Sequence, residues 1–535
     1  MRFLLLIFIS LLSITSFAQF THDDTLRGSE TPERIWWNLK HYDLILKVFP
    51  SEKKISGSNS ITFDLVRPQK KMQVDLQLPL IMDSVVFENA KLKFTKDGAN
   101  AHLIEFPKEL KIRQDYTVTC YYSGFPKEAI RAPWDGGIVW NKDKNGKPII
   151  ATACQGIGAS IWWPCKDHMY DEPENGMQIS VNTPKEVMNV SNGRLIENRI
   201  ENDGTRTTVW EVKNPINNYG VNMNVADYAT WSEVYAGEKG LLDMTFYVYA
   251  ENLEKAKVHF KDATRTMEAF EHWFGPYPFY EDSYKLVEVP YLGMEHQSSV
   301  TYGNKFMHGY LGSDLSGTGW GKKWDYIIVH ESGHEWFANS ITYRDAADMW
   351  LHEGFTSYSE GLFVEYFYGK DAGAEYLRGL RSGISNKSPI IGTYNVNQEG
   401  SGDMYPKGAN LLHTIRQMVN NDSIWRSFLR NLNKDFYHQI VTSKRIESYM
   451  SMKLQMDLSS VFDQYLRTTD IPTLVIQKKG KKLEYKWTNV VQDFTMAIEV
   501  CIDGKAVRIV PTEYFLEVKC KKFEISPDYY IKISK

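Results

Sequence analysis

Apolar and polar side chains alternate with a period of two along residues 36–230. The first such run alternates at four apolar positions, Tyr42, Leu44, Leu46 and Val48. We expect Ser56-Gly57-Ser58 to turn the chain before the next run, Ile61-Thr62-Phe63. Short alternating runs separated by Gly, Asn, Asp and Pro continue from there. This pattern predicts the strands of a large antiparallel β domain.

The period changes after about residue 230. Apolar residues then recur at steps of four and three, as on one face of a helix, at Ala256, Phe260, Ala263, Met267, Phe270 and Phe274. The pair Gly275-Pro276 is a typical end for such a helix. Helical patterns continue to about Arg467, so the middle of the chain is predicted to be mainly helical.

The last part of the chain, residues 471–535, returns to a strand pattern. Leu483, Tyr485 and Trp487 alternate, and Asp503-Gly504 separates two apolar runs as a hairpin turn does. At 535 residues the chain is too long for a single core. We therefore expect a multidomain α+β protein with an N-terminal β domain (19–229), a mainly helical domain (230–468) and a small C-terminal β module (469–535).

Residues 1–18 have the layout of a secretory signal peptide. Arg2 precedes an apolar run, and Ser16-Phe17-Ala18 forms a small-x-small cleavage site. An uncleaved membrane anchor is the alternative, although the apolar run is short for a membrane span. We expect an exported protein, periplasmic or extracellular, whose mature chain has no membrane span.

Net charge and cysteine content bear on the class of binding partner and on disulfide bonding. The net charge of −4 is small for this length, so it gives no argument for a nucleic-acid partner. The five cysteines are odd in number and irregularly spaced, which is no disulfide framework. Cys501 and Cys520 lie in the same terminal segment and could pair, a question the sequence leaves open.

The segment His330-Glu331-Ser332-Gly333-His334 carries the candidate chemistry, and it lies within a helical pattern. On a helix, residues four apart lie one turn above each other on the same face. Two imidazoles so placed can hold one Zn²⁺, and Glu331 can reach a zinc-bound water as general base. A motif this short also arises by chance on a charged helix, so it needs further support.

A catalytic zinc ion needs a third protein ligand and an open fourth position. Eighteen residues after His334, the segment Trp350-Leu351-His352-Glu353-Gly354-Phe355 offers Glu353 among apolar neighbours. A carboxylate buried in such surroundings needs a partner, and a metal ion would serve. We expect His330, His334 and Glu353 to hold one zinc ion.

Together these residues resemble the M1 (gluzincin) family of zinc aminopeptidases, in which the same histidine pair is followed at the same distance by a glutamate. The segment Leu292-Gly293-Met294-Glu295-His296 resembles the family's Gly-x-Met-Glu-Asn motif. The resemblance implies that Glu295 binds the free α-amino group of the substrate, and that Gly293 and Met294 line the edge that receives the peptide. A carboxylate at a fixed distance from the metal selects a positively charged chain end.

Two further segments extend the resemblance. Tyr405-Pro406-Lys407-Gly408 is similar to the family's Tyr-x-Lys-Gly segment, which implies that the Tyr405 hydroxyl stabilises the oxyanion. Cys154-Gln155-Gly156-Ile157 resembles the corresponding segment in the leukotriene A4 hydrolase branch of the family, which implies that Gln155 and Tyr291 lie near the substrate amine. A glutamine offers one acceptor oxygen and no charge, so amine binding should depend more on Glu295.

The resemblance implies an N-terminal β saddle, a thermolysin-like catalytic domain and a small C-terminal β-sandwich module. Departures from the family pattern, such as His296 and His352 in place of Asn, bear on substrate preference more than on activity. The sequence thus predicts a zinc aminopeptidase that acts on peptides with a free N-terminus. A thermolysin-like endopeptidase and a non-catalytic, zinc-stabilised peptide-binding protein stay open as alternatives.

Overall fold

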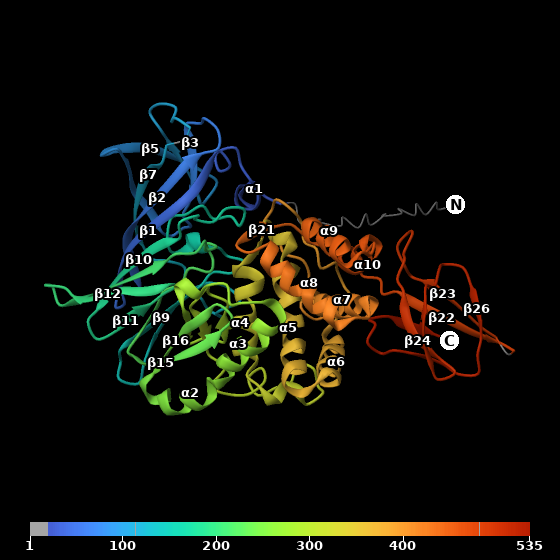
Figure 1. The fold of residues 1–535 in the computed structure, drawn as a ribbon. Helices are drawn as coiled ribbons and strands as arrows, with labels where there is room; N and C mark the ends of the chain where they lie inside the picture. The colour runs from blue at the N-terminus through green and yellow to red at the C-terminus, as the bar shows by residue number, and fades with distance from the viewer. Residues whose placement is uncertain (1–19, 113, 481) are drawn as a thin grey trace, which may run out of the picture.

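The computed structural model describes residues 20–112, 114–480 and 482–535. The predicted signal peptide lies outside these residues. Figure 1 shows the N-terminal β-rich part in blue and teal, the helices in the centre, and the red C-terminal module at the far side of the helices. Within the described ranges, no helix combines the length and the apolar character needed to cross a membrane.

The N-terminal part is built on a long sheet in which β1 (Trp37–Phe49) pairs with β2 (Lys54–Leu65) along almost its whole length. Neighbouring strands are antiparallel except β1 and β10 (Met177–Pro184), which run parallel. The order of strands among the described residues is β12 (Arg194–Ile200), β13 (Thr205–Val212), β10 (Met177–Pro184), β1 (Trp37–Phe49), β2 (Lys54–Leu65), β7 (Tyr116–Gly124), β4 (Ile81–Phe87), β5 (Ala90–Asp97), β6 (Ala101–Glu105) and β3 (Lys71–Asp75). A second sheet orders β11 (Met188–Val190), β14 (Asn224–Ala226), β9 (Pro148–Ala153) and β8 (Gly137–Lys142).

The period-two pattern of the sequence is the burial pattern of β1. Leu44, Leu46 and Val48 point into the core while the residues between them are more exposed. The turn predicted at residues 56–58 is wrong, because these residues lie inside β2 and pair with β1. Gly57 is needed there for another reason: a Cβ atom at this position would lie 2.0 Å from the Ile45 carbonyl oxygen.

The middle of the chain packs helices against a mixed sheet. The sheet orders β15 (Tyr228–Gly237), β16 (Gly240–Tyr249), β17 (Tyr284–Glu288), β19 (Val300–Tyr302) and β18 (Gly293–Met294), so β18 is an edge strand. The helices are α2 (Leu253–His259), α3 (Lys261–Phe274), α4 (Tyr326–Gly333), α5 (Trp350–Tyr368), α6 (Lys370–Gly379), α7 (Pro406–Val419), α8 (Asp422–Asp435), α9 (Ser443–Leu454) and α10 (Ser459–Arg467). The short strands β20 (Ile341–Tyr343) and β21 (Gln439–Val441) pair beside them.

The helix predicted from residue 256 to residue 274 is two helices. Phe260 separates α2 from α3, and its ring stays buried against Trp231 and Tyr302. The apolar stripe is therefore continuous although the helix is not. Gly275 ends α3 as predicted, with φ of +93° and its N–H donated to the Glu271 carbonyl.

The C-terminal module consists of two small sheets, as the strand pattern predicted. One orders β26 (Leu516–Lys519), β23 (Lys482–Thr488), β22 (Thr473–Lys479) and β28 (Lys532–Ser534), and the other orders β25 (Lys505–Ile509), β24 (Ile498–Ile502) and β27 (Phe523–Ile525). Asp503-Gly504 forms the hairpin between β24 and β25. Cys501 and Cys520, which the sequence left as a possible pair, are both free thiols.

Candidate metal centre and active site

Helix α4 brings the two histidines together. The buried Asp325 side chain caps its first turn by accepting the Ile328 N–H at 3.1 Å. The helix ends at Gly333, where a Cβ atom would lie 2.9 Å from Ser359 Oγ of α5. His334 follows directly and still has helical backbone angles. The two imidazoles therefore face the same space one turn apart, with their Nε2 atoms separated by 3.3 Å.

The third predicted ligand reaches this space from α5. Glu353 Oε2 lies 3.6 Å from His330 Nε2 and 3.3 Å from His334 Nε2, and the residue is 1% exposed. Among the described residues this oxygen has no hydrogen-bond donor. Two imidazole nitrogens and one such carboxylate oxygen, all within 4.8 Å of one another, are the donor set that suits a catalytic zinc ion with one position left open.

A second layer of residues orients the two histidines. His330 Nδ1 lies 2.7 Å from Glu360 Oε1 and 3.2 Å from the Tyr326 hydroxyl. His334 Nδ1 lies 3.0 Å from the Phe337 carbonyl oxygen. Because these acceptors bind the Nδ1 proton, the Nε2 lone pairs are left free for a metal.

Glu360 was not predicted from the sequence, although a signal was present. Glu360 lies seven residues after Glu353 on α5, so the two carboxylates share one face of the helix two turns apart. Tyr326 likewise lies one turn before His330 on α4.

Glu331 and Tyr405 lie on the wall of the same cavity as His330, His334 and Glu353. Burial raises the pKa of Glu331, which favours its acting as a proton acceptor. Tyr405 stacks on His330 with ring centroids 6.1 Å apart. Burial first, and then the charge of Glu353, raise the pKa of Tyr405 well above its ordinary value. The phenol therefore keeps its proton and can donate a hydrogen bond.

The residues after Tyr405 explain why that tyrosine lies beside the site. A Cβ atom on Gly408 would lie 2.8 Å from the Cα atom of Gly354, so α7 can approach α5 closely only with glycine at this position. Lys407 is buried and donates from Nζ to the Thr468 carbonyl at 2.9 Å. The Lys-Gly part of the segment thus fixes the start of α7 next to Glu353, and Tyr405 is the residue just before that helix.

Glu295 and Gln155 are hydrogen-bonded to each other beside His334 and Glu353. Gln155 Nε2 donates to Glu295 Oε1 at 2.7 Å and to Glu353 Oε1 at 3.1 Å. Ligand atoms of Glu295, Glu331 and His334 also lie within 4.8 Å of one another. Burial raises the pKa of Glu295. A carboxylate partly desolvated in this way favours a cationic partner.

These side chains line a cavity of about 510 Å³. Of the residues that the sequence predicted, it is lined by His330, His334, Glu353, Glu331, Tyr405, Glu295, Gly293, Met294 and Gln155. Tyr291 is not on its wall: it is buried, and its hydroxyl donates to the Thr152 carbonyl at 2.8 Å. The lining also includes residues that the sequence did not single out, among them Tyr310, Trp134 and Glu399.

The two histidines that depart from the family pattern have structural contacts. His352 Nε2 accepts the Tyr343 N–H at 2.9 Å, and burial lowers the pKa of His352 well below its ordinary value. His296 Nδ1 lies 3.2 Å from Thr301 Oγ1. Neither is on the cavity wall, so neither competes with His330 and His334 as a ligand.

Comparison with known proteins places this geometry in a family. Residues 38–219 match the model of the Peptidase M1 N-terminal domain, and residues 258–465 match that of the Peptidase family M1 domain. The second match contains the histidine pair, Glu353 and Tyr405.

Curated relatives are distant in sequence. The human endoplasmic reticulum aminopeptidase 1 is 21% identical over 82% of this chain and 49% of its own length. Aminopeptidase N of Lactococcus lactis is 22% identical over 81% of this chain and 51% of its own length. Leukotriene A-4 hydrolase of Xenopus laevis is 22% identical over 78% of this chain and 68% of its own length. The chain spans about half the length of most of the curated relatives it matches.

Solved structures share the fold. The M1 zinc metallopeptidase from Deinococcus radiodurans superposes with a TM-score of 0.66 at 21% identity, over 78% of this chain and 91% of that one. A variant of the same enzyme bound to a Tyr-Ser-Ala substrate gives a TM-score of 0.67 at 19% identity, over 81% of this chain and 94% of that one. Two family models in the expected order, with the ligand set inside the second, lead to one conclusion: the chain belongs to peptidase family M1, a family of zinc metallopeptidases.

Proposed function

We propose that this protein is a zinc-dependent aminopeptidase that hydrolyses the first peptide bond of peptides with a free N-terminus. The observation that carries the proposal is the place of Glu295. Its carboxylate lies within 4.8 Å of ligand atoms of Glu331 and His334. An ammonium group bound to Glu295 leaves room for only one residue between the chain end and the scissile bond. An endopeptidase would need that space for further residues of the substrate.

In the proposed reaction each of these residues on the cavity wall has a separate role. His330, His334 and Glu353 would hold the zinc ion, which would supply Lewis acidity toward water and the scissile carbonyl. Glu331 takes a proton from the attacking water and delivers it to the leaving amine. The Tyr405 hydroxyl donates a hydrogen bond to the oxyanion, which typically lowers such a barrier by about 3–4 kcal/mol.

The sheet edge beside the site supports the binding of an extended peptide. Gly293 and Met294 form the edge strand β18, whose other side pairs with β19. A Cβ atom on Gly293 would lie 2.4 Å from Ile327 Cγ2 and 3.3 Å from Glu331 Cγ, so glycine keeps the edge close to α4. A peptide added to such an edge makes main-chain hydrogen bonds, and we propose that the substrate binds in this way.

A blocked substrate tests the proposed function. We expect a free-amine tripeptide to be hydrolysed and its N-acetylated twin to be rejected by a factor of about 100 or more, because acetylation removes the charge that Glu295 binds. In Glu295→Gln the ratio of the hydrolysis rates of the free-amine peptide and its acetylated twin should fall most of the way to one. Product release from both peptides is measured by chromatography in the wild-type protein and the variant.

The same assay separates the alternatives. Equal cleavage of the two peptides, or cleavage at an internal bond, would identify an endopeptidase. Binding without turnover would leave a non-catalytic peptide-binding protein. The presence of Glu331 and Tyr405 beside the ligand set supports catalysis, because binding alone requires neither.

Glu360 gives a second prediction at this site. Glu360→Gln keeps the shape of the side chain but removes the charge next to His330 Nδ1. We expect zinc affinity to fall about 10- to 100-fold, as for other second-layer partners of histidine ligands. Competition with a fluorescent zinc chelator measures this affinity. Glu447 is the control because it pairs with Arg467 through a buried carboxylate outside the cavity wall, so Glu447→Gln should leave the zinc affinity unchanged.

A further inference from the structure

A segment before the first sheet lies against the active-site wall from outside. Residues 20–34, here called the N-terminal strap, include α1 (His22–Gly28), which begins with a capping box between Thr21 and Asp24. The strap precedes residue 38, where the match to the family models begins. Its contacts therefore belong to a part of the chain that the family match does not cover.

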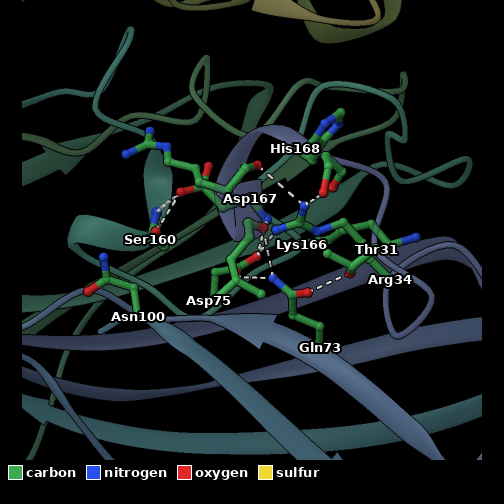
Figure 2. Close-up of polar contacts among 12 residues, drawn as sticks. Thr31, Arg34, Gln73, Asp75, Asn100, Ser160, Lys166, Asp167 and His168 are labelled. Atoms are coloured by element: carbon green, nitrogen blue, oxygen red, sulfur yellow. Dashed lines mark hydrogen bonds and ion pairs between the residues drawn. The ribbon is translucent and has the colours of Figure 1, made fainter. Parts of the chain in front are cut away.

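Buried polar groups of the N-terminal β domain hold the strap in place (Figure 2). Arg34 is 0% exposed, and it donates to Asp75 Oδ2 at 2.8 Å and to the Ser29 carbonyl at 2.6 Å. Thr31 Oγ1 donates to Gln73 Oε1 at 2.6 Å. Because a buried charge–charge hydrogen bond is costly to break, the strap has a fixed position on this domain.

The strap also contacts the catalytic domain. Glu30 accepts two hydrogen bonds from Arg344, which follows β20, at 2.6 and 2.7 Å. A Cβ atom on Gly28 would lie 2.0 Å from the backbone nitrogen of Asn397, so glycine permits this close approach. The strap thus bridges the two domains next to the cavity.

Arg27 connects the strap to the active-site loop. Its Nη2 donates to the Gly156 carbonyl at 2.8 Å, and Asn397 Nδ2 donates to the same oxygen at 3.2 Å. Gly156 lies on the wall of the active-site cavity, and also on the wall of a narrower crevice that Arg27 lines. The peptide unit at Gly156 therefore separates the strap from the substrate space.

The loop that Arg27 holds is a tight turn. The Gly158 N–H donates to the Cys154 carbonyl at 2.7 Å, and Gly156 and Gly158 have φ of +71° and +93°. The Ile157 N–H, in the same peptide unit as the Gly156 carbonyl, donates to the Gln155 carbonyl at 2.8 Å, so holding that peptide unit also holds Gln155. The Gln155 amide nitrogen already donates to Glu295 and Glu353, so its oxygen is the acceptor left for a substrate ammonium group.

We propose that Arg27 is a positioning residue for the peptide N-terminus: through the Gly156 carbonyl it holds Gln155 where its amide oxygen, together with Glu295, receives the substrate amine. This inference rests on the proposed aminopeptidase function. It assigns a role in substrate binding to a segment that lies before both matched domains.

The test compares Arg27→Ala and Arg27→Lys with a control on the same strap. Glu30→Gln weakens the contact with Arg344 but leaves Arg27 and Gly156 in place. With leucine p-nitroanilide, we expect Arg27→Ala to raise KM about tenfold and to leave kcat within about twofold, because ground-state positioning of the amine is lost. Arg27→Lys should recover part of this loss, and Glu30→Gln should leave KM unchanged.

A binding measurement gives a readout that a merely structural role would not change. In the Glu331→Gln background, calorimetry measures Kd for tri-alanine and for its N-acetylated twin. We expect Arg27→Ala to reduce the ratio of the Kd of the acetylated peptide to the Kd of tri-alanine about tenfold. If Arg27→Ala does not fold, the same ratio measured with Arg27→Lys decides, with about a threefold change expected.

Three outcomes are distinguishable. If wild-type protein binds and cleaves both peptides equally, the aminopeptidase function itself fails, and this inference fails with it. If wild-type protein discriminates and the Arg27 variants keep the full ratio, only the role of Arg27 is overturned. An equal rise of KM in Glu30→Gln would also overturn it, because the effect would then come from loosening the strap as a whole.

Discussion

Replacing Glu331 with Gln should reduce kcat by about 10³- to 10⁴-fold while the protein keeps its zinc ion. The substitution keeps the side-chain volume but removes the proton acceptor, and general-base catalysis typically contributes a factor of about 10² to 10⁴. We assign the metal to His330, His334 and Glu353 and not to the second group of Glu295, Glu331 and His334, so metal binding should survive this substitution. Initial rates with an aminoacyl anilide and metal analysis of the same sample measure both quantities.

The control for this experiment is a conservative change at a buried glutamate outside the cavity. Glu172 is buried and accepts a hydrogen bond from Thr342 at 2.7 Å, and it is not on the cavity wall. Glu172→Gln should keep kcat within about twofold. Turnover by Glu331→Gln at more than about a tenth of the wild-type rate would contradict the assigned role of Glu331.

Removing the zinc ion should abolish turnover and also lower stability. A strong chelator should bring the rate to background, and one equivalent of zinc should restore it, because the Lewis acid is then replaced in an intact site. A ligand that binds the folded state at 100 times its Kd stabilises it by about 2.7 kcal/mol, so the melting temperature should fall on chelation and recover with zinc.

A ligand variant completes this prediction. His334→Ala removes one of the two imidazoles proposed to bind zinc. We expect the zinc content at equimolar metal to fall from one ion per chain to well below half an ion per chain. Zinc should then no longer raise the melting temperature. If His334→Ala retains full zinc content and activity, the ligand assignment is wrong.

The sequence predicted that His330, His334 and Glu353 come together because spacing on a helix translates directly into geometry. His330 and His334 lie one turn apart, and Glu353 enters on a second helix among apolar residues, as its neighbours indicated. The order of β, helical and β segments was predictable for the same reason, since period two and period 3.6 are local properties.

Long-range contacts could not be predicted in this way. Tyr291 was expected beside the substrate amine, but its hydroxyl bonds to the backbone of β9. The Arg27–Gly156 contact joins residues 129 positions apart. Gly57 was interpreted as a turn residue, whereas close packing of β1 on β2 requires it. In each case the partner is set by tertiary packing, which no local pattern encodes.

The most direct test of the account is a crystal structure of the zinc-loaded protein with anomalous data collected on both sides of the zinc absorption edge. We expect a single strong anomalous peak about 2.0–2.2 Å from His330 Nε2, His334 Nε2 and a Glu353 carboxylate oxygen. No peak at this position, or a zinc ion held by other side chains, would contradict it.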